Sequence, residues 1–152
     1  MNQGRKGKRG WLGTIAVALA TVLVIGLGLT GCDRKSDSSA GKDTVTLYFG
    51  DKDAMYLVPE TRTVDKKDRS LEAAVIEELL KGPQKEGSVP TIPESTRVLS
   101  VTVVDDVAYV DFSKEFQTEH PGGSAGEIMT IYSVVNTLTG LPGVEKVQFL
   151  LE

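Results

Sequence analysis

The chain has 152 residues, a formal net charge of −4, one cysteine and one histidine. A single cysteine excludes an internal disulfide. One cysteine and one histidine together are too few for a zinc ligand set. An acidic chain is also poorly suited to holding nucleic acid, whose phosphates would repel it.

The first 31 residues have the layout of a bacterial export signal. Four basic residues and no acidic residue occur in the first ten positions, and Trp11–Leu29 follows without a charge. Leu29-Thr30-Gly31-Cys32 then resembles the lipobox of bacterial lipoproteins, in which a small residue precedes the cysteine that is lipidated. We therefore expect a signal peptide over residues 1–31 and a diacylglyceryl anchor on Cys32. Such an anchor would hold the rest of the chain on the extracytoplasmic side of the cell membrane.

Two alternatives stay open for this segment. Trp11–Leu29 would be roughly 28 Å long as a helix, at about 1.5 Å per residue, so it could remain in the membrane as a spanning anchor. Cys32 could instead be a reactive thiol or one half of an intermolecular disulfide. Neither alternative explains why the cysteine stands at the position that the lipobox requires.

Residues 32–43 predict a flexible polar linker that begins with the lipidated cysteine. The side chains after Cys32 are charged, polar or small, so they bury too little apolar surface to order the segment. Residues 44–152 are enough for one domain and too few for two of ordinary size. The signal holds four of the 17 basic residues and none of the 21 acidic ones, so this domain is more acidic than the whole chain.

The domain opens with a predicted β-hairpin. Thr44–Phe49 alternates polar and apolar residues, as a half-buried strand does, and ends in the turn signal Gly50–Asp53. Met55–Val64 predicts the partner strand. Pro59 has no N–H to donate to a ladder, so that partner is expected at a sheet edge.

A helix is predicted from about Ser70. Its apolar residues recur at helical spacing, and Lys81-Gly82-Pro83 supplies a clear stop. Residues 84–94 contain two more prolines and predict a loop. The apolar positions of the helix are Leu71, Val75, Ile76, Leu79 and Leu80.

Arg97–Phe112 is the best hairpin pattern in the chain. A two-residue turn at Asp105-Asp106 would set Val104 opposite Val107 and Leu99 opposite Phe112. This register gives the hairpin one apolar face and one wet face.

A second helix is predicted from Ser124, with Glu127 at capping-box spacing and Gly140 at its end. A last strand follows at Lys146–Leu151. The order ββαββαβ predicts an α+β fold: a compact two-layer domain in which two helices cover one face of a largely antiparallel sheet. The apolar stripe expected on the second helix is Ile128, Ile131, Tyr132, Val135 and Leu138.

Short segments spread over Thr44–Glu152 carry a family resemblance. They are Leu47–Phe49, Leu57–Arg62, Glu72-Ala73, Leu79–Pro83, Ile92-Pro93, Val110–Ser113, Glu127, Val134–Thr139 and Val144–Glu152. In this order they resemble the GerMN domain of sporulation and spore germination proteins. The resemblance implies an extracytoplasmic, membrane-tethered module with a compact α/β fold, related to ring-building modules of secretion-like complexes. Tandem domains occur in the family, whereas this chain carries one, so a contact between two domains would need a second chain.

An enzyme would need catalytic groups that the sequence supplies only in scattered form. His120, the sole histidine, lies in a predicted loop, and no serine stands in a Gly-x-Ser-x-Gly pattern. A glycosidase needs two carboxylates, and each candidate also fits a surface or helix-cap role. The carboxylate candidates are Asp111, Glu115, Glu119 and Glu127.

Asp51 opens a segment that begins like a calcium loop, but Arg62 stands where the bidentate glutamate is required. We therefore expect no catalysis, no metal and no cofactor. Glu60 and Arg62 lie two apart on one strand face, and two roles stay open for them: a structural ion pair or a candidate contact with a partner.

The function expected from these features is that of a non-catalytic, membrane-anchored lipoprotein. Its domain would act as a protein-interaction or assembly module in the cell envelope, in sporulation or spore germination as the resemblance implies. Envelope or sporulation proteins, the membrane itself and a second copy of the chain are the candidate partners, and nucleic acid is not. The alternatives are a wall hydrolase acting on peptidoglycan and a small solute-binding lipoprotein.

Overall fold

The computed structural model describes residues 41–152. The signal peptide predicted over residues 1–31, the lipid anchor on Cys32 and most of the linker predicted over residues 32–43 lie outside the described residues. The described residues all belong to one compact unit. From residue 41 onward, none of the helices is both long and apolar enough to cross a bilayer.

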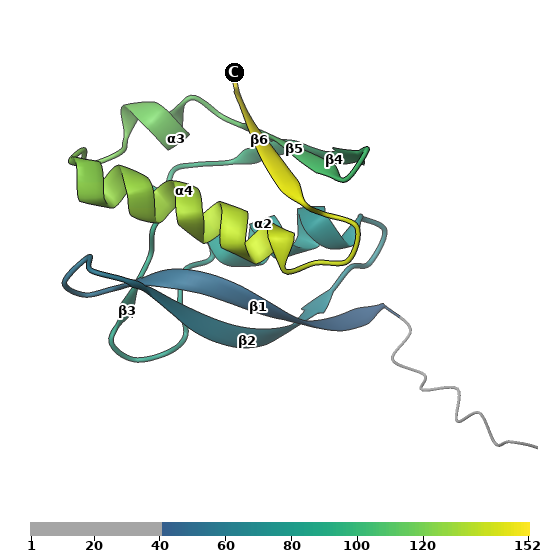
Figure 1. The fold of residues 1–152 in the computed structure, drawn as a ribbon, viewed down its shortest axis with the longest axis horizontal. Helices are drawn as coiled ribbons and strands as arrows, with labels where there is room; N and C mark the ends of the chain where they lie inside the picture. Colours follow the sequence, from purple (N-terminus) through teal and green to yellow (C-terminus); the bar gives the residue numbers. More distant parts are fainter. Residues whose placement is uncertain (1–40) are drawn as a thin grey trace, which may run out of the picture. The chain divides into compact units, whose positions relative to one another are not determined.

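Two three-stranded sheets lie on either side of a layer of helices (Figure 1). One sheet has the order β2-β1-β3 and the other β4-β5-β6. Their strands are β1 (Lys42–Asp51), β2 (Leu57–Asp65), β3 (Ser88–Val89), β4 (Val98–Val104), β5 (Val107–Phe112) and β6 (Lys146–Leu151). The helices are α2 (Leu71–Leu80), α4 (Ser124–Thr139) and the short α3 (Glu115–Thr118).

The α+β class is confirmed, and the pairing is largely antiparallel, with β5 and β6 as the parallel pair. The layering differs from the expected single sheet with two helices on one face. The reason is that both helices bury side chains in two directions: α4 contacts β1 and β6, and α2 contacts β1 and β4. A helix with two buried sides needs a layer on each of them.

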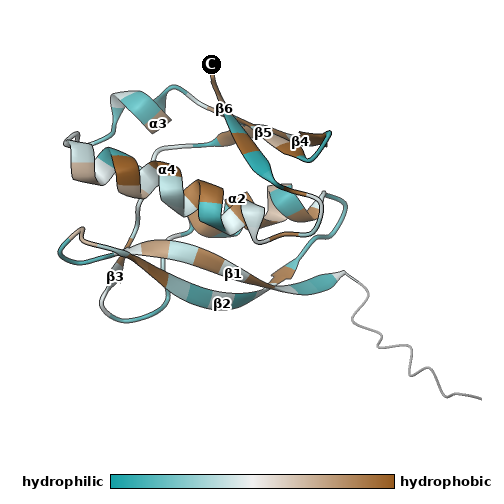
Figure 2. Ribbon diagram, in the orientation of Figure 1, coloured by the Kyte–Doolittle hydropathy of each residue, from teal (hydrophilic) through white to brown (hydrophobic). Residues whose placement is uncertain are grey.

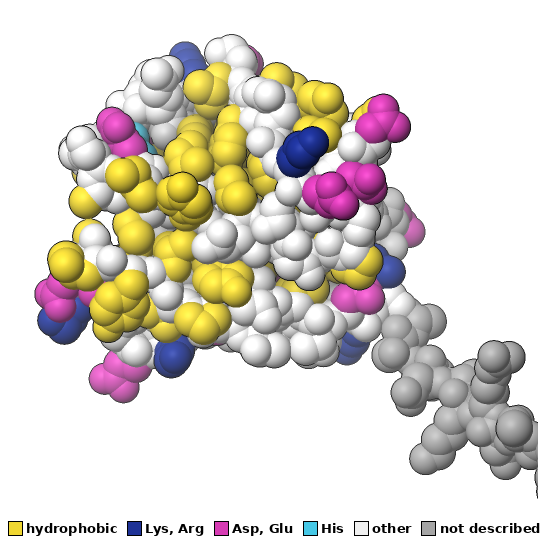
Figure 3. All heavy atoms as spheres, viewed as in Figure 1, with side chains coloured by type: hydrophobic (Ala, Val, Ile, Leu, Met, Phe, Trp, Pro, Cys, Tyr) yellow, Lys and Arg dark blue, Asp and Glu magenta, His cyan; other side chains and the backbone are white. Residues whose placement is uncertain are grey.

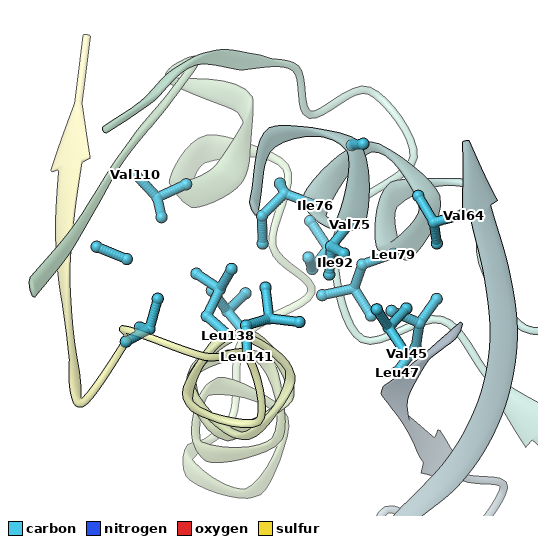
Figure 4. Close-up of a cluster of buried hydrophobic side chains, with 14 of the residues drawn as sticks. Val45, Leu47, Val64, Val75, Ile76, Leu79, Ile92, Val110, Leu138 and Leu141 are labelled. Atoms are coloured by element: carbon cyan, nitrogen blue, oxygen red, sulfur yellow. The ribbon is translucent and has the colours of Figure 1, made fainter. Parts of the chain in front are cut away.

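The core fills the space between the two sheets (Figure 4). Val45, Leu47 and Phe49 enter it from β1, and Val110 and Phe112 enter it from β5. At the far end the rings of Phe112 and Phe116 stack with centroids 4.5 Å apart. Helix side chains from both α2 and α4 lie between these two sets, so a single core joins all three layers.

The first hairpin agrees with the sequence pattern. β1 and β2 pair antiparallel from Lys42 opposite Asp65 to Gly50 opposite Leu57. β1 begins two residues before the expected domain start at residue 44. Pro59 lies on β2 at the edge of the sheet and faces Tyr48, whose own N–H is directed to α4. The missing N–H of the proline therefore costs no hydrogen bond with β1.

The second hairpin has the predicted turn and a shifted end. Asp105 and Asp106 have φ values of 49° and 61°, as a tight hairpin turn requires and as aspartate tolerates. The pairing of Leu99 with Phe112 was wrong, because a bulge brings Val98 opposite Phe112 instead. Leu99 is left 46% exposed. Ser113 fixes this register: its N–H donates to Arg97 O, and its hydroxyl accepts from Arg97 N–H, at 2.9 and 3.0 Å.

The first predicted helix is confirmed as α2, and Ser70 caps it by accepting a hydrogen bond from Ala73 N–H. β3 and α3 fall inside segments predicted as loops. With two and four residues, they are too short to leave a periodic pattern in the sequence.

The face of α4 that is buried differs from the predicted stripe. Ile128, Ile131 and Tyr132 were expected in the core, yet they are exposed. Only Leu138 of the stripe is fully buried. The cap also differs, because Gly123 precedes the helix and Ser124 makes no side-chain capping bond. The buried residues of α4 are Met129, Thr130, Ser133, Val134, Thr137 and Leu138.

The buried hydroxyls of α4 hydrogen-bond the free edge of β1. β3 covers that edge only at Gly50 and Asp51. At Tyr48 the backbone N–H donates to Thr137 Oγ1 at 3.1 Å, and Ser133 Oγ donates to the Tyr48 carbonyl at 2.5 Å. Ser133 and Thr137 are one helical turn apart, so both reach the same residue of the strand. These bonds explain why hydroxyls face inward and isoleucines face outward.

A buried ion pair fastens α2 to β2. The Arg62 guanidinium lies 2.6 Å from Glu60 Oε1 and donates to the Glu78 and Gly82 carbonyls at the end of α2, at 3.1 and 2.7 Å. It also lies over the Phe49 ring. Arg62 therefore satisfies carbonyls that the helix end leaves without partners.

Glu60 also binds the segment that follows α2. Its carboxylate accepts from the backbone N–H groups of Gln84 and Lys85, each at 3.0 Å. Burial alone would raise the pKa of Glu60, but the hydrogen bond from Arg62 and the two amides outweigh it and hold the pKa below its ordinary value. The ionised carboxylate is thus a structural part of the fold.

Replacing Thr137 by valine keeps the side-chain shape and removes the hydroxyl. We expect T137V to lower the free energy of unfolding by about 1–3 kcal/mol, because Tyr48 N–H is left without a partner. Urea unfolding measures this change. The control is T139V, since the Thr139 hydroxyl bonds only the Val135 carbonyl of its own helix. Equal effects of the two substitutions would contradict the role of Thr137 at the strand edge.

The Glu60 carboxylate makes stability depend on pH. Because its pKa is lowered on folding, its contribution is complete above the unfolded pKa of about 4.3 and is lost as pH falls through the folded pKa. We expect E60Q to destabilise the domain at neutral pH by roughly 1.5–3 kcal/mol. The gap from the unsubstituted protein should narrow below about pH 4. Unfolding curves at several pH values measure this gap, with E86Q at an exposed site as the control; a gap that is constant with pH would refute it.

Candidate functional site

Glu60 and Arg62, the candidate partner contact, are mostly buried. Their side chains are only 10% and 6% exposed, and the partners described above all belong to this chain. The geometry therefore favours the structural ion pair, and a contact of these residues with another protein stays a prediction. Cys32 lies outside the described residues.

Exposed apolar side chains gather instead on one face of the domain. Figure 3 shows them over α4, β6 and the end of the first hairpin, and Figure 2 shows the hydrophobic end of β6. Met55 and Tyr132, for example, are 77% and 54% exposed. We call this set the apolar face: Met55, Tyr56, Ile128, Ile131, Tyr132 and Leu151.

The loop that carries Met55 and Tyr56 is held by Asp51. One carboxylate oxygen of Asp51 accepts from the N–H groups of Met55 and Tyr56 at 2.6 and 2.8 Å, and the other accepts from Asp53 N–H at 3.0 Å. The Tyr56 amide is the main cause of the lowered pKa of Asp51, with Met55 and Asp53 adding to it against the effect of burial. Asp51 thus binds backbone amides, as a loop anchor does, at the place where the sequence resembled the start of a calcium loop.

His120 is built into the fold through both ring nitrogens. Gly122 N–H donates to Nδ1 at 3.0 Å, so Nε2 carries the proton and donates to Thr130 Oγ1 at 2.9 Å. The Thr130 hydroxyl in turn shares its one hydrogen between the carbonyls of Thr91 and Gly126. A catalytic triad needs the opposite arrangement, with Nδ1–H held by a carboxylate and Nε2 free to accept. His120 therefore ties the loop after α3 to α4 and does not activate a nucleophile.

Two shallow hollows flank His120. One, of about 270 Å³, lies between the β3 segment and the start of α4 and is lined by residues that include Pro90, Ile92 and Met129. The other, of about 350 Å³, lies between α3, α4 and the end of β6, where Phe116, Ile131 and Leu151 line it. Both present mostly apolar walls, which suit an apolar side chain of another protein better than a polar substrate.

The carboxylates considered for glycoside hydrolysis come from separate elements, and of the four only Glu127 lines either of the two hollows. Asp111 is on β5, Glu115 opens α3, Glu119 follows α3 and Glu127 is on α4. The Ser113 hydroxyl is the main cause that lowers the pKa of Glu115, whereas a general acid needs a raised pKa.

Within residues 41–152, no group of three or more histidine, cysteine or acidic residues is arranged to hold a metal ion. The apolar face was not predicted, since its α4 residues were assigned to the core. The signal that could have revealed it is the spacing of Thr130, Ser133 and Thr137, which marks a second, hydroxyl-bearing side of the helix.

Comparison with known proteins identifies relatives of this domain. The family model described as sporulation and spore germination (Germane) matches residues 46–152. No curated protein matches the chain. Several solved structures do match.

Two of these structures come from the sporulation protein GerM of Bacillus subtilis. Its tandem GerMN domains are 25% identical, with a TM-score of 0.61, over 76% of this chain and 41% of that one. This chain thus spans about two fifths of the tandem structure. The first GerMN domain alone is 27% identical, with a TM-score of 0.58, over 72% of this chain and 83% of that one.

A third structure is that of a putative lipoprotein from Clostridium perfringens. It is 30% identical, with a TM-score of 0.51, over 75% of this chain and 77% of that one. The family match covers nearly all of the described domain, and the solved structures share its fold. The chain belongs to the Germane family of sporulation and spore germination domains.

Proposed function

We propose that this protein is an extracytoplasmic lipoprotein, anchored to the membrane through Cys32, whose domain binds other proteins of the cell envelope during sporulation or germination. In this proposal the domain performs no catalysis. It acts by position, since the anchor keeps it near the membrane and the domain selects its partners.

The observation that carries the proposal is the apolar face. Its exposed side chains come from three separate elements, α4, β6 and the β1–β2 loop, and a soluble domain that exposes such a surface commonly uses it to bind a partner. The β1–β2 loop, whose backbone Asp51 holds in one conformation, forms one border of this surface. Tyrosine and methionine, both present here, are residue types enriched in protein interfaces.

Two further observations support the setting. The family is defined by sporulation and spore germination, and a related structure is that of a putative lipoprotein. The lipobox at Leu29–Cys32 and the basic N-terminus supply the sequence features that a lipoprotein needs.

A photo-crosslinking amino acid at position 132 tests the interaction role. The tyrosine ring at this position is exposed on the apolar face. We therefore expect the crosslinking residue that replaces Tyr132 to form adducts with envelope proteins in cells collected through growth and sporulation. The control is the same group at Thr63, an exposed position on β2. Mass spectrometry of the adducts identifies the partners. No adduct at position 132, together with muropeptide release from peptidoglycan by the purified domain, would replace this proposal by the wall hydrolase.

The anchor is tested by C32S. Serine cannot form the thioether, so we expect uncleaved precursor or release of the domain into the medium. Immunoblots of membrane and medium fractions measure both products. Normal processing and retention of the substituted protein in the membrane would show that Cys32 is not lipidated. S38A in the predicted linker is the control and should behave as the unsubstituted chain.

A further inference from the structure

β6 is an edge strand whose outward-facing backbone groups can be identified from its hydrogen bonds. Lys146 N–H donates to Asp106 O, and Glu152 N–H donates to Phe112 O, each at 3.2 Å. In a parallel pair, alternate residues of a strand bond to the same neighbour. The even-numbered residues of β6 therefore bond to β5, and the N–H and C=O groups of Val147, Phe149 and Leu151 point away from the sheet.

The other described sheet edges each carry a feature that discourages strand addition. β2 has Pro59, β3 has only two residues, and β4 has the bulge at Leu99. Proline, very short strands and bulges are devices that protect sheet edges. β6 has none of these, and within residues 41–152 the side-chain hydrogen bond found at its outward-facing groups is that of Gln148, whose Nε2 donates to the Phe149 carbonyl at 3.0 Å.

We propose that a second copy of this chain pairs with β6 through its own β6, antiparallel, with Phe149 on the twofold axis. This proposal rests on the proposed function and names one partner for it. Hydrogen-bonded pairs in such a ladder join outward-facing residues, so odd-numbered residues must face odd-numbered ones. The register centred on Phe149 pairs all three of them: Phe149 with its own copy, and Val147 with Leu151.

Charge complementarity selects the same register. It sets Lys146 opposite Glu152 of the second copy on both sides of the axis, and opposite charges that face each other across strands stabilise a sheet. Both residues are exposed, and neither has a salt bridge among those found in the described part of the chain. Shifting the register by two residues would remove Lys146 from Glu152 and leave backbone groups unpaired.

The apolar face extends this contact beyond the strand. Leu151 of β6 and Ile131 of α4 line the same hollow, so the side of the joined sheet that faces the helices is flanked by exposed apolar side chains. A six-residue strand alone buries little area, and a stable dimer usually buries about 1,200–2,000 Å² in total. The side chains of α4 next to β6 supply the additional surface.

Charge reversal tests both the partner and the register. The experiment measures the dimer association constant of residues 39–152 by sedimentation equilibrium, since this segment is one compact unit. We expect K146E and E152K each to weaken association on the order of tenfold, because each sets like charges face to face twice. The double variant K146E/E152K should restore association, since the opposite charges are exchanged. K67E, at an exposed site between β2 and α2 beside the other sheet, is the control and should associate as the unsubstituted protein does.

The outcomes separate this proposal from the proposed function. Circular dichroism checks that every variant is folded. A domain that stays monomeric at every concentration, or a double variant that is weaker than both single variants, overturns pairing through β6. If crosslinks from position 132 to envelope proteins persist in that case, the interaction role stands and only the second copy is excluded as partner.

Discussion

The hydrogen bonds between α4 and Tyr48 are the constraint on which the arrangement of the layers depends. A strand edge that is buried against a helix would normally leave backbone groups without partners, at a cost of about 1–3 kcal/mol for each group. Ser133 and Thr137 remove that cost, so the helix can cover the open part of β1 that β3 does not reach. Once α4 is fixed in this orientation, its isoleucines and Tyr132 must face outward. The α4 part of the apolar face is thus a geometric consequence of how the strand edge is satisfied.

The sequence was sufficient where local chemistry decides the structure. Neighbouring residues determine the alternation in β1, the end of α2 after Leu80 and the turn at Asp105-Asp106. Each of these elements has the predicted form. Two results depend on contacts distant in sequence. The buried side of α4 is selected by a strand some 85 residues away, and hydropathy alone assigns isoleucine to the core before serine or threonine. The bulge at Leu99 is set by Ser113 at the far end of the hairpin. The family resemblance succeeded because it combines many weak local signals in a fixed order.

The candidate site was less predictable than the fold for a related reason. Catalytic and metal sites use characteristic residue types that can be found in a sequence. An interaction surface consists of ordinary apolar residues, and their exposure is seen only in the structure. His120 illustrates the difference, since its residue type suggested chemistry but its hydrogen bonds give it a structural role. Glu60 and Arg62 likewise combine into a fastening for α2. The buried pair was a candidate for the surface, whereas Ile128, Ile131 and Tyr132 were expected in the core and are exposed.

The way Asp51 holds the β1–β2 loop has a consequence for how binding specificity can change. Its carboxylate bonds to the backbone amides of residues 53, 55 and 56 and not to their side chains. The conformation of the loop is therefore largely independent of which side chains Met55 and Tyr56 carry. Substitution at these two positions can alter the surface that a partner meets without loss of loop geometry, and the fixed backbone limits the conformational entropy lost on binding. In the proposed function, this arrangement would let the side chains of the loop change while the backbone that presents them stays the same.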